Sequence, residues 1–119
     1  DSQELRRLGF GRLSRWTLDD GGIKLEFCEW DNCSSWLYAF VVEKRVRYIG
    51  MATTVLRSRL DGYSYQLNDR VGMKIKKLLE QRNEVEIFGA MRPGVQRADL
   101  EAEESVLIKD FKPDWNVRR

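Results

Sequence analysis

The stretch WLYAFVV, residues 36–42, decides the fold of this chain. An uninterrupted run of apolar, aromatic and β-branched residues of this length is typical of a strand buried on both faces. The polar tripeptide EKR at positions 43–45 interrupts the run, and VRYIG at positions 46–50 resumes it. The two segments are therefore predicted to pair as a β-hairpin with a three-residue turn.

A second hairpin is predicted on the N-terminal side of this stretch. Residues 10–18 and 23–29 flank DDGG at positions 19–22, which has the composition of a tight turn. Ile23, Leu25 and Phe27 alternate with polar neighbours, as expected for a strand with one buried face. No repeat, low-complexity segment or long linker separates this part from the rest of the chain.

The C-terminal side is predicted to contain three helices and one more strand. The first is a short helix that is capped by Thr53 or Thr54, runs to Leu60 and is stopped by Asp61-Gly62. A longer helix is expected from an N-cap at Asn68 to Arg82, followed by a strand over 84–89. The last helix is expected from an N-cap at Asp99 to Phe111, and Pro113 ends it. This order predicts an α/β (α+β) fold in which a small mixed, mainly antiparallel sheet is flanked by helices.

Composition limits the classes of function. The chain has 119 residues, enough for one domain, and 42% hydrophobic residues, enough for one core. Its formal net charge is only +2, so nucleic-acid binding would depend on where charge is placed. The chain has no histidine, which excludes histidine-based triads, proton shuttles and zinc sites. General acid-base chemistry would therefore use carboxylates, lysines or tyrosines.

The expected compartment is the cytoplasm. The two cysteines, Cys28 and Cys33, form no disulfide framework and lack partners for a zinc site, which favours a reducing environment. No apolar run approaches the ~20 residues of a membrane span, and the first residues, DSQE, contain no signal segment. We therefore expect no membrane partner.

One residue departs from the pattern of the last predicted helix. Leu100, Leu107 and Phe111 form an apolar stripe with spacing i, i+7 and i+11, and Glu104 occupies the i+4 position of that stripe. A carboxylate there costs free energy unless it is paired, hydrated or bound to a cation. Glu104 is therefore either at the edge of the stripe, paired with an arginine, or a cation ligand.

Three more side chains are candidates for a site. In the short helix, Arg59 adjoins the stripe formed by Leu56 and Leu60, whereas Arg57 is predicted to point away. Arg59 is thus the better candidate for a sheltered guanidinium. Tyr38 and Tyr48 lie in the paired strands; core packing explains a tyrosine in a strand, but without histidine a phenol is one of the few groups able to relay a proton.

A family resemblance rests on five pieces of sequence in a fixed order. They are LYA at 37–39, YIG at 48–50, LRSRL at 56–60 with Tyr63, ESVLIK at 104–109, and FKPDWN at 111–116. Together they resemble the GIY-YIG endonuclease superfamily over residues 36–116. The last two pieces resemble the incision nuclease of nucleotide excision repair and the phage endonuclease II type. The resemblance implies a GIY-YIG nuclease core over residues 36–119 and a β-hairpin extension of the same domain over residues 1–35.

The resemblance implies a metal-dependent phosphodiesterase. Glu104 matches the single metal-binding carboxylate, for one Mg²⁺ or Mn²⁺ ion per site, and Arg59 matches the catalytic arginine that holds the scissile phosphate. Tyr38 and Tyr48 match the tyrosines of the two motifs, one of which activates the attacking water. Among substrate-binding positions, Gly50 matches the glycine that allows close approach, Tyr63 lies where relatives place a histidine or tyrosine near the substrate, and Asn116 matches the asparagine that closes the site.

The expected partner is double-stranded DNA. Basic residues gather in two groups. One lies in the hairpin and the first helix and the other along the second helix: Lys44, Arg45, Arg47, Arg57 and Arg59, and Lys74, Lys76, Lys77 and Arg82. Phosphate contacts are expected from Arg57 in the first group and Lys74 in the second. A chain of this size has one active site. Cutting both strands would therefore need a homodimer, a higher homo-oligomer or sequential nicking.

Position 51 departs from the family pattern. Many relatives carry a lysine directly after the YIG motif, and this chain has Met51. The missing charge keeps a second hypothesis open, in which the chain is a catalytically weak or inactive GIY-YIG nucleic-acid-binding module. A third hypothesis is an interaction protein in which Glu104 and Arg59 form only a buried ion pair.

Overall fold

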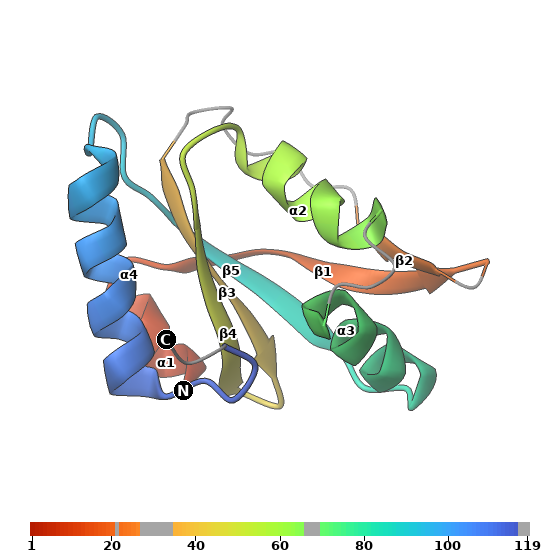
Figure 1. Ribbon diagram of the computed structural model, residues 1–119. Helices are drawn as coiled ribbons and strands as arrows, with labels where there is room; N and C mark the ends of the chain where they lie inside the picture. The colour runs from red at the N-terminus through yellow and green to blue at the C-terminus, as the bar shows by residue number, and fades with distance from the viewer. Residues whose placement is uncertain (21, 27–34, 66–69, 117–119) are drawn as a thin grey trace.

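The structure is a computed structural model that describes residues 1–20, 22–26, 35–65 and 70–116 (Figure 1). Five strands and four helices follow one another in these residues: α1 (Ser2–Arg7), β1 (Gly11–Asp19), β2 (Gly22–Leu25), β3 (Trp36–Val42), β4 (Arg45–Ala52), α2 (Leu56–Tyr65), α3 (Arg70–Glu80), β5 (Val85–Met91) and α4 (Arg97–Phe111). The predicted α+β class is confirmed. Asn68, Cys28, Cys33 and the end of the second predicted strand lie outside the described residues.

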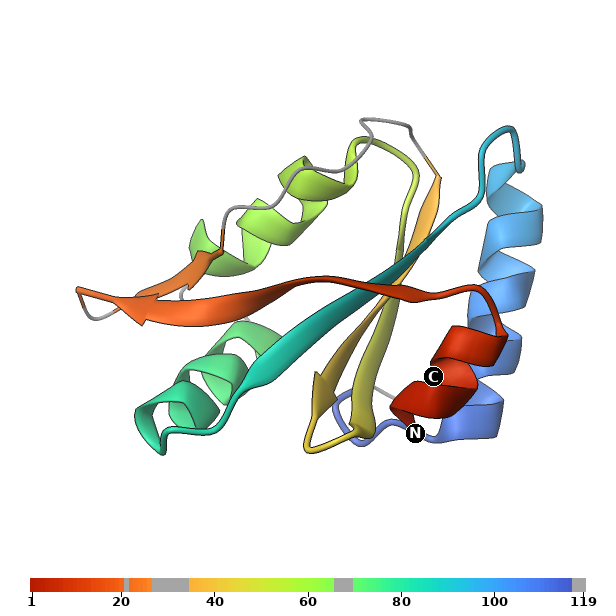
Figure 2. The same ribbon diagram turned by 180° about the vertical axis from the view of Figure 1, so that it is seen from behind.

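The strands form one sheet in the order β2-β1-β5-β3-β4. All four pairings between these strands are antiparallel. The last strand in the sequence, β5, lies in the middle and pairs with β1 on one side and β3 on the other. The two predicted hairpins therefore belong to one continuous sheet, and β5 joins them, as the two opposite views show (Figures 1 and 2).

The turn between β3 and β4 is shorter than the sequence indicated. Val42 pairs with Arg45, so only Glu43 and Lys44 connect the strands. Both residues have positive φ angles, 51° and 67°, as a two-residue hairpin turn that follows the twist of the sheet requires. Arg45 is thus the first residue of the second strand rather than the last residue of the turn.

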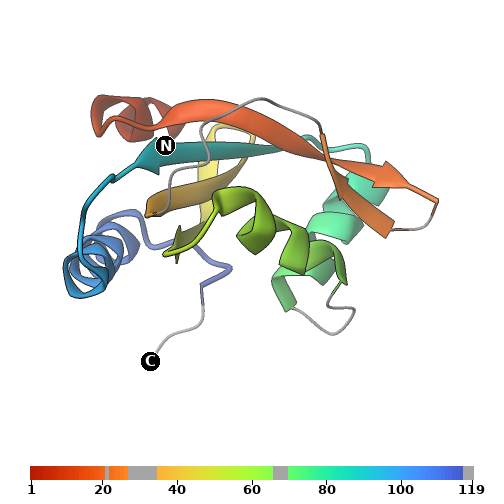
Figure 3. The same ribbon diagram turned by 90° about the horizontal axis from the view of Figure 1, so that it is seen from above.

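Each face of the sheet has its own hydrophobic core. Every residue of β3 is buried, as predicted for a central strand, and successive side chains alternate between the two faces. One core, here called the first core, contains Tyr38 and Phe40 with the inward residues of α2 and α3. The second core contains Leu37 and Ala39 with the inward residues of α1 and α4. The helices accordingly form two groups about the sheet (Figure 3).

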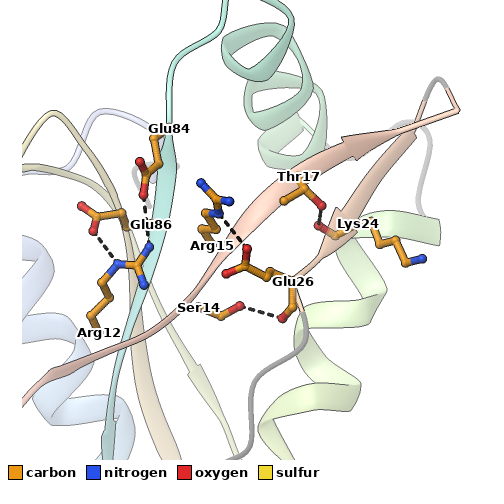
Figure 4. A network of polar contacts seen from close by, with 8 residues as sticks. All are labelled: Arg12, Ser14, Arg15, Thr17, Lys24, Glu26, Glu84 and Glu86. Carbon is orange, nitrogen blue, oxygen red and sulfur yellow. Dashed lines mark hydrogen bonds and ion pairs between the residues drawn. The ribbon is translucent and has the colours of Figure 1, made fainter.

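Polar contacts fasten β1 to its neighbours (Figure 4). Glu86 on β5 accepts a hydrogen bond of 2.6 Å from Arg12, and Glu84, just before β5, accepts one of 3.1 Å from the same side chain. On the other side, the buried hydroxyl of Ser14 donates to the carbonyl oxygen of Glu26 at 2.7 Å, and Arg15 pairs with the Glu26 carboxylate at 2.8 Å. These contacts hold the N-terminal hairpin in register with the rest of the sheet.

The helix boundaries correct two predictions, the end of the short helix and the start of the last helix. Asp61-Gly62 does not end α2, which begins at Leu56 and continues to Tyr65. One glycine inside a helix costs only about 1 kcal/mol, and the Asp61 carboxylate lies 3.9 Å from the guanidinium of Arg57 one turn earlier. The last helix begins before Asp99, with Gln96 at its N-cap.

The first helix, α1, was not predicted. It has six residues, Asp1 caps it by accepting bonds from two backbone amides, and only Leu5 is buried. Such a segment is too short to show helical periodicity. Across the described residues, no helix is both long and apolar enough to cross a membrane.

Candidate active site

Tyr38 is paired with a glycine on each neighbouring strand. The strand register places Tyr38 opposite Gly50 on β4 and opposite Gly89 on β5. A Cβ atom at Gly50 would overlap the Tyr38 ring and lie 2.5 Å from its hydroxyl oxygen, so no other residue fits there without displacing the tyrosine. The family resemblance implies that Gly50 lets backbone and substrate approach each other closely; within the protein, the group that lies against Gly50 is Tyr38.

Three tyrosine hydroxyls form a chain on the face of the first core. The Tyr38 and Tyr63 oxygens are 2.7 Å apart, and Tyr63 donates to Tyr48 at 3.3 Å. If Tyr63 gives its proton to Tyr48, Tyr38 must be the donor to Tyr63, because each phenol has one proton. The longer contact exceeds the usual 2.5–3.0 Å range of hydroxyl pairs and is therefore the weaker of the two. The order of the chain leaves the proton of Tyr48 available to a group outside it.

Helix α2 and two aromatic side chains position this chain. Leu56, Leu60 and Tyr63 are buried at spacing i, i+4 and i+7, so the stripe that packs α2 onto the sheet also carries the tyrosine. Phe40 stacks on Tyr48 with ring centres 5.5 Å apart. On β1, Trp16 meets Tyr63 edge to face with ring centres 6.3 Å apart. Each tyrosine ring is therefore held by packing as well as by its hydroxyl.

Burial keeps two of the three phenols protonated. Tyr38 has no exposed surface, and burial raises its pKa above the usual range; the positive charge of Arg59 offsets only part of that effect. Burial also raises the pKa of Tyr63, and the neighbouring Tyr38 raises it further. Both groups are neutral hydrogen-bonding phenols at neutral pH. Tyr48 is half-buried, and it is the member of the chain with access to the outside.

Arg59 lies beside the tyrosines. Its guanidinium carbon is 5.7 Å from the centre of the Tyr63 ring, within the range of a cation–π contact. Electrostatic attraction to the Tyr38 phenol is the main effect that raises the pKa of Arg59, and burial opposes it. Arg59 is nevertheless exposed, whereas Arg57 is half-buried, which reverses the sheltering predicted from helical phase. The guanidinium of Arg59 leans over the ring face and keeps a side open to solvent.

Glu104 lies on α4, between two turns that pack against the sheet. Leu100 and Leu107 are fully buried in the second core, and Glu104 is half-buried on the same stripe. The second core faces the opposite side of β3 from Tyr38. Among the described residues, no group of three or more Asp, Glu or Cys side chains is close enough together to hold a metal ion. Any cation here would therefore rely on few carboxylates.

Asn116 binds the backbone of the edge strand. Its side-chain oxygen accepts from the Ile49 amide at 3.0 Å, and its side-chain nitrogen donates to the Ile49 carbonyl at 2.8 Å. The neighbouring amide of Trp115 donates to the carbonyl of Arg47 at 2.9 Å. The C-terminal segment thus occupies the open edge of β4 next to Gly50, and Asn116 contributes to the site by holding this backbone.

Sequence reasoning missed two contributors to the site. One is Trp16, which is 1% exposed and whose indole nitrogen has no hydrogen-bond partner among the described residues. The other is the ion pair between Arg47 and Asp114, whose two contacts are 2.8 and 3.0 Å long. The guanidinium carbon of Arg47 also lies 5.4 Å from the centre of the Trp115 ring. The only signal for Trp16 was an aromatic residue on the inward phase of the first hairpin. The Arg47–Asp114 pair, 67 residues apart in sequence, left no local signal.

The remaining predicted substrate-binding residues lie on helices of the same face. Arg57 is on α2, and Lys74 is half-buried on α3. Met51, at the position where relatives carry lysine, packs against the second core. The structure therefore brings Tyr38, Tyr48, Tyr63, Gly50 and Arg59 together, and it places Glu104 and Lys74 on separate elements.

Comparison with known proteins identifies the fold. No family model matches the sequence, and no curated protein matches it. A mutant form of EndoII from bacteriophage T4 superposes with a TM-score of 0.76 and 22% sequence identity, covering 98% of both chains. The restriction endonuclease HPY188I in complex with product DNA superposes with a TM-score of 0.60 and 14% identity, covering 100% of this chain and 83% of the other. The predicted resemblance to the phage endonuclease II type is thus confirmed at the level of the fold, which this chain shares with a phage endonuclease and a restriction endonuclease.

Proposed function

We propose that this chain is a divalent-metal-dependent DNA endonuclease of the GIY-YIG type that hydrolyses phosphodiester bonds. The observation that carries the proposal is the chain of three tyrosine hydroxyls beside the guanidinium of Arg59. It lies on a fold shared with two endonucleases, one of them solved with product DNA. Packing alone explains buried tyrosine rings, but it does not require their hydroxyls to be connected to one another next to an exposed cation.

The proposed roles follow from exposure and charge. Arg59 binds the scissile phosphate through its exposed side, where a planar fork of donors suits phosphate oxygens. Tyr48 is the phenol that contacts the attacking water or the phosphate, because Tyr38 and Tyr63 are buried. Those two remain neutral and orient the Tyr48 hydroxyl through the hydrogen-bonded chain. Gly50 and Asn116 act as positioning residues for Tyr38 and for the strand that carries Tyr48.

A single hard cation fits the donors that the chain offers. Mg²⁺ needs only one or two carboxylates from the protein, because water and substrate phosphate complete its shell. Glu104, half-buried on the stripe of α4, would hold one Mg²⁺ or Mn²⁺ ion. When bound, the ion supplies charge neutralisation at the phosphoryl oxygens. The chain's own contribution is then Arg59 at the phosphate and the tyrosine hydroxyls at the proton that must be moved.

The proposed partner is double-stranded DNA, and the proposed compartment is the cytoplasm, with no membrane partner. One protomer offers one site. Cleavage of both strands therefore takes place in a homodimer or higher homo-oligomer, or as two successive nicks.

A specific observation favours a second candidate function. Met51 packs on the second core and supplies no cation to the site, as expected of a catalytically weak or inactive nucleic-acid-binding module.

The two functions differ in the fate of supercoiled plasmid. The endonuclease converts it to nicked or linear DNA with Mg²⁺ and leaves it intact when the metal is chelated, whereas the binding module leaves it intact in both conditions. Arg59→Ala is expected to lower the rate about 100-fold or more, because one phosphate-neutralising group is worth several kcal/mol in the transition state. Arg57→Ala, a control on the same helix, should lower it less than tenfold. Equal losses from both variants would contradict the role of Arg59.

A further inference from the structure

The helices on the two faces of the sheet carry opposite charge. On the face of the first core, α2 and α3 together contain six basic residues and two acidic ones, a difference of +4. On the other face, α1 and α4 together contain four basic residues and six acidic ones, a difference of −2. The whole chain has a formal net charge of only +2, so the asymmetry lies in where the charges are placed.

Three of the four basic residues of α3 follow one stripe. Arg70, Lys74 and Lys77 have the spacing i, i+4 and i+7, which places them in one row along the helix, and Gln81 follows at i+11 just beyond its end. The inward side of the same helix carries Val71 and Ile75. The row from Arg70 to Lys77 spans about 10 Å at ~1.5 Å per residue.

Neither solubility nor ion pairing accounts for this stripe. Lysines that serve solubility alone would be distributed over both faces, and α4 on the other face is acidic. Lys74 and Lys77 make no ion pair with any residue that the structure describes. By contrast, acidic residues of α4 pair within the chain, Glu101 with Arg97 and Glu103 with Arg92.

We propose that duplex DNA runs across the layer formed by α2 and α3, and that Arg70, Lys74 and Lys77 bind its phosphates beyond the active site. This inference rests on the proposed function, because it identifies the route of the substrate over the same face. Helix α3 packs beside α2, which carries Arg57 and Arg59, so the two basic helices are neighbours on the face that holds the tyrosine site (Figure 3).

The stripe adds affinity without reading sequence, because lysine contacts to phosphate are independent of the base. The molecule is 38 Å long. That length corresponds to about 11 base pairs of duplex, one turn of the double helix, at two charges per ~3.4 Å. A duplex lying along the long axis of the molecule would therefore meet one protomer over about one turn.

The test is the salt dependence of DNA binding, measured without divalent metal so that nothing is cleaved. A labelled duplex of about 20 base pairs is titrated at several NaCl concentrations with wild type and with the Lys74→Ala/Lys77→Ala variant. Loss of two phosphate contacts should reduce the slope of log K against log [salt] by about 1.8, and affinity at ~0.1 M salt should fall about 10- to 60-fold. The matched control is Arg7→Ala/Lys109→Ala, which removes two exposed charges from α1 and α4.

The control should retain the wild-type slope. An unchanged slope in the Lys74/Lys77 variant, or an equal loss in the control, would overturn the proposed route. Thermal unfolding of both variants verifies that they are folded. The single variant Lys77→Ala, at an exposed position, gives an independent measure and should change the slope by about half as much. Plasmid cleavage by wild type separates the two proposals. If wild type cleaves plasmid and the Lys74→Ala/Lys77→Ala variant keeps the wild-type slope, only the proposed route of the DNA is overturned. If the variant has a reduced slope and wild type does not cleave, only the proposed endonuclease activity is overturned.

Discussion

The ring of Tyr38 lies directly against the backbone of Gly50, at a distance that leaves no room for a Cβ atom. The glycine of the YIG motif is therefore explained by a contact inside the protein. A side chain at position 50 would push Tyr38 away from Tyr63 and break the shortest hydroxyl contact of the site, which is 2.7 Å. The position of the tyrosine hydroxyls thus depends on glycine at position 50.

Replacing Gly50 with alanine is expected to destabilise the protein. The added methyl group overlaps the buried Tyr38 ring, and overpacking of this kind costs about 1–3 kcal/mol. Gly62→Ala is the matched control, because a Cβ there meets nothing within 4 Å and the position lies inside α2. That variant should gain about 0.5–1 kcal/mol from helix propensity. Urea unfolding measures both values, and a Gly50→Ala variant as stable as wild type would contradict the overlap with the Tyr38 ring.

Alkaline titration is expected to separate the tyrosines. Burial raises the pKa of Tyr38 and Tyr63, so two of the four phenols should ionise well above the usual value of about 10 while the protein remains folded. The stability that these neutral phenols contribute is complete below pH ~10 and is lost as pH rises further, because the unfolded chain releases the protons first. Phenolate absorbance measures the effect. Four phenols titrating together near pH ~10 in the native protein would contradict it.

The sequence predicted the sheet better than the site. The apolar run at 36–42 and the DDGG turn specify local pairing, and both hairpins are present. No local pattern indicates that β5 inserts between them, because its pairing with β1 and β3 joins residues far apart in the sequence, such as Phe40 with Ile87. Helical phase placed Glu104 on the buried stripe correctly, but it failed for Arg59, whose long side chain leans over Tyr63.

Tertiary contacts also explain what local rules missed at the ends of the chain. Helix α1 is stabilised by an Asp1 cap and by burial of Leu5, neither of which produces a repeating pattern in six residues. The role of Asn116 depends on its position beside Ile49, reached only after the chain has folded back to the edge of β4. Motif resemblance identified the residue, and the structure gives its hydrogen-bond partners.

Acid should weaken the contact that holds the C-terminal segment. Burial of Asp114 raises its pKa, but the hydrogen bond and charge of Arg47 outweigh that effect, so the pKa is below the usual value. The pair therefore contributes stability above pH ~4, and the contribution is lost as pH falls through the lowered pKa. Both side chains are partly exposed, which limits the contribution to about 0.5–1 kcal/mol.

The variant Asp114→Asn keeps the shape of the side chain and removes its charge. It should be less stable than wild type at pH ~7 by that amount, and the difference should close below pH ~3. Chemical unfolding at both pH values measures it. A difference that persists unchanged in acid would show that the charge of Asp114 is not what holds the segment.

Removing single hydroxyls should reveal the order of the tyrosine chain. Tyr48→Phe is expected to lower kcat about 10²- to 10⁴-fold, because it deletes the half-exposed phenol at the outer end of the chain. Tyr38→Phe should also impair cleavage strongly, because Tyr63 loses its 2.7 Å partner and with it the orientation it gives to Tyr48. The pH–rate profile below pH ~10 should be the same in Tyr38→Phe as in wild type, since Tyr38 stays protonated there. A profile that changes its shape in this variant would assign the proton acceptor to Tyr38 instead.

The most direct test of the proposed metal-dependent endonuclease is Glu104→Gln, assayed for both cleavage and binding. Glutamine keeps the size of the side chain on the stripe of α4 and removes the negative charge that would hold the ion. We predict that plasmid cleavage with Mg²⁺ falls at least ~10³-fold, about 4 kcal/mol in the barrier, while duplex binding without metal stays close to that of wild type. The control Glu101→Gln changes an exposed carboxylate of the same helix and should cleave normally. Wild-type cleavage by Glu104→Gln would contradict the account.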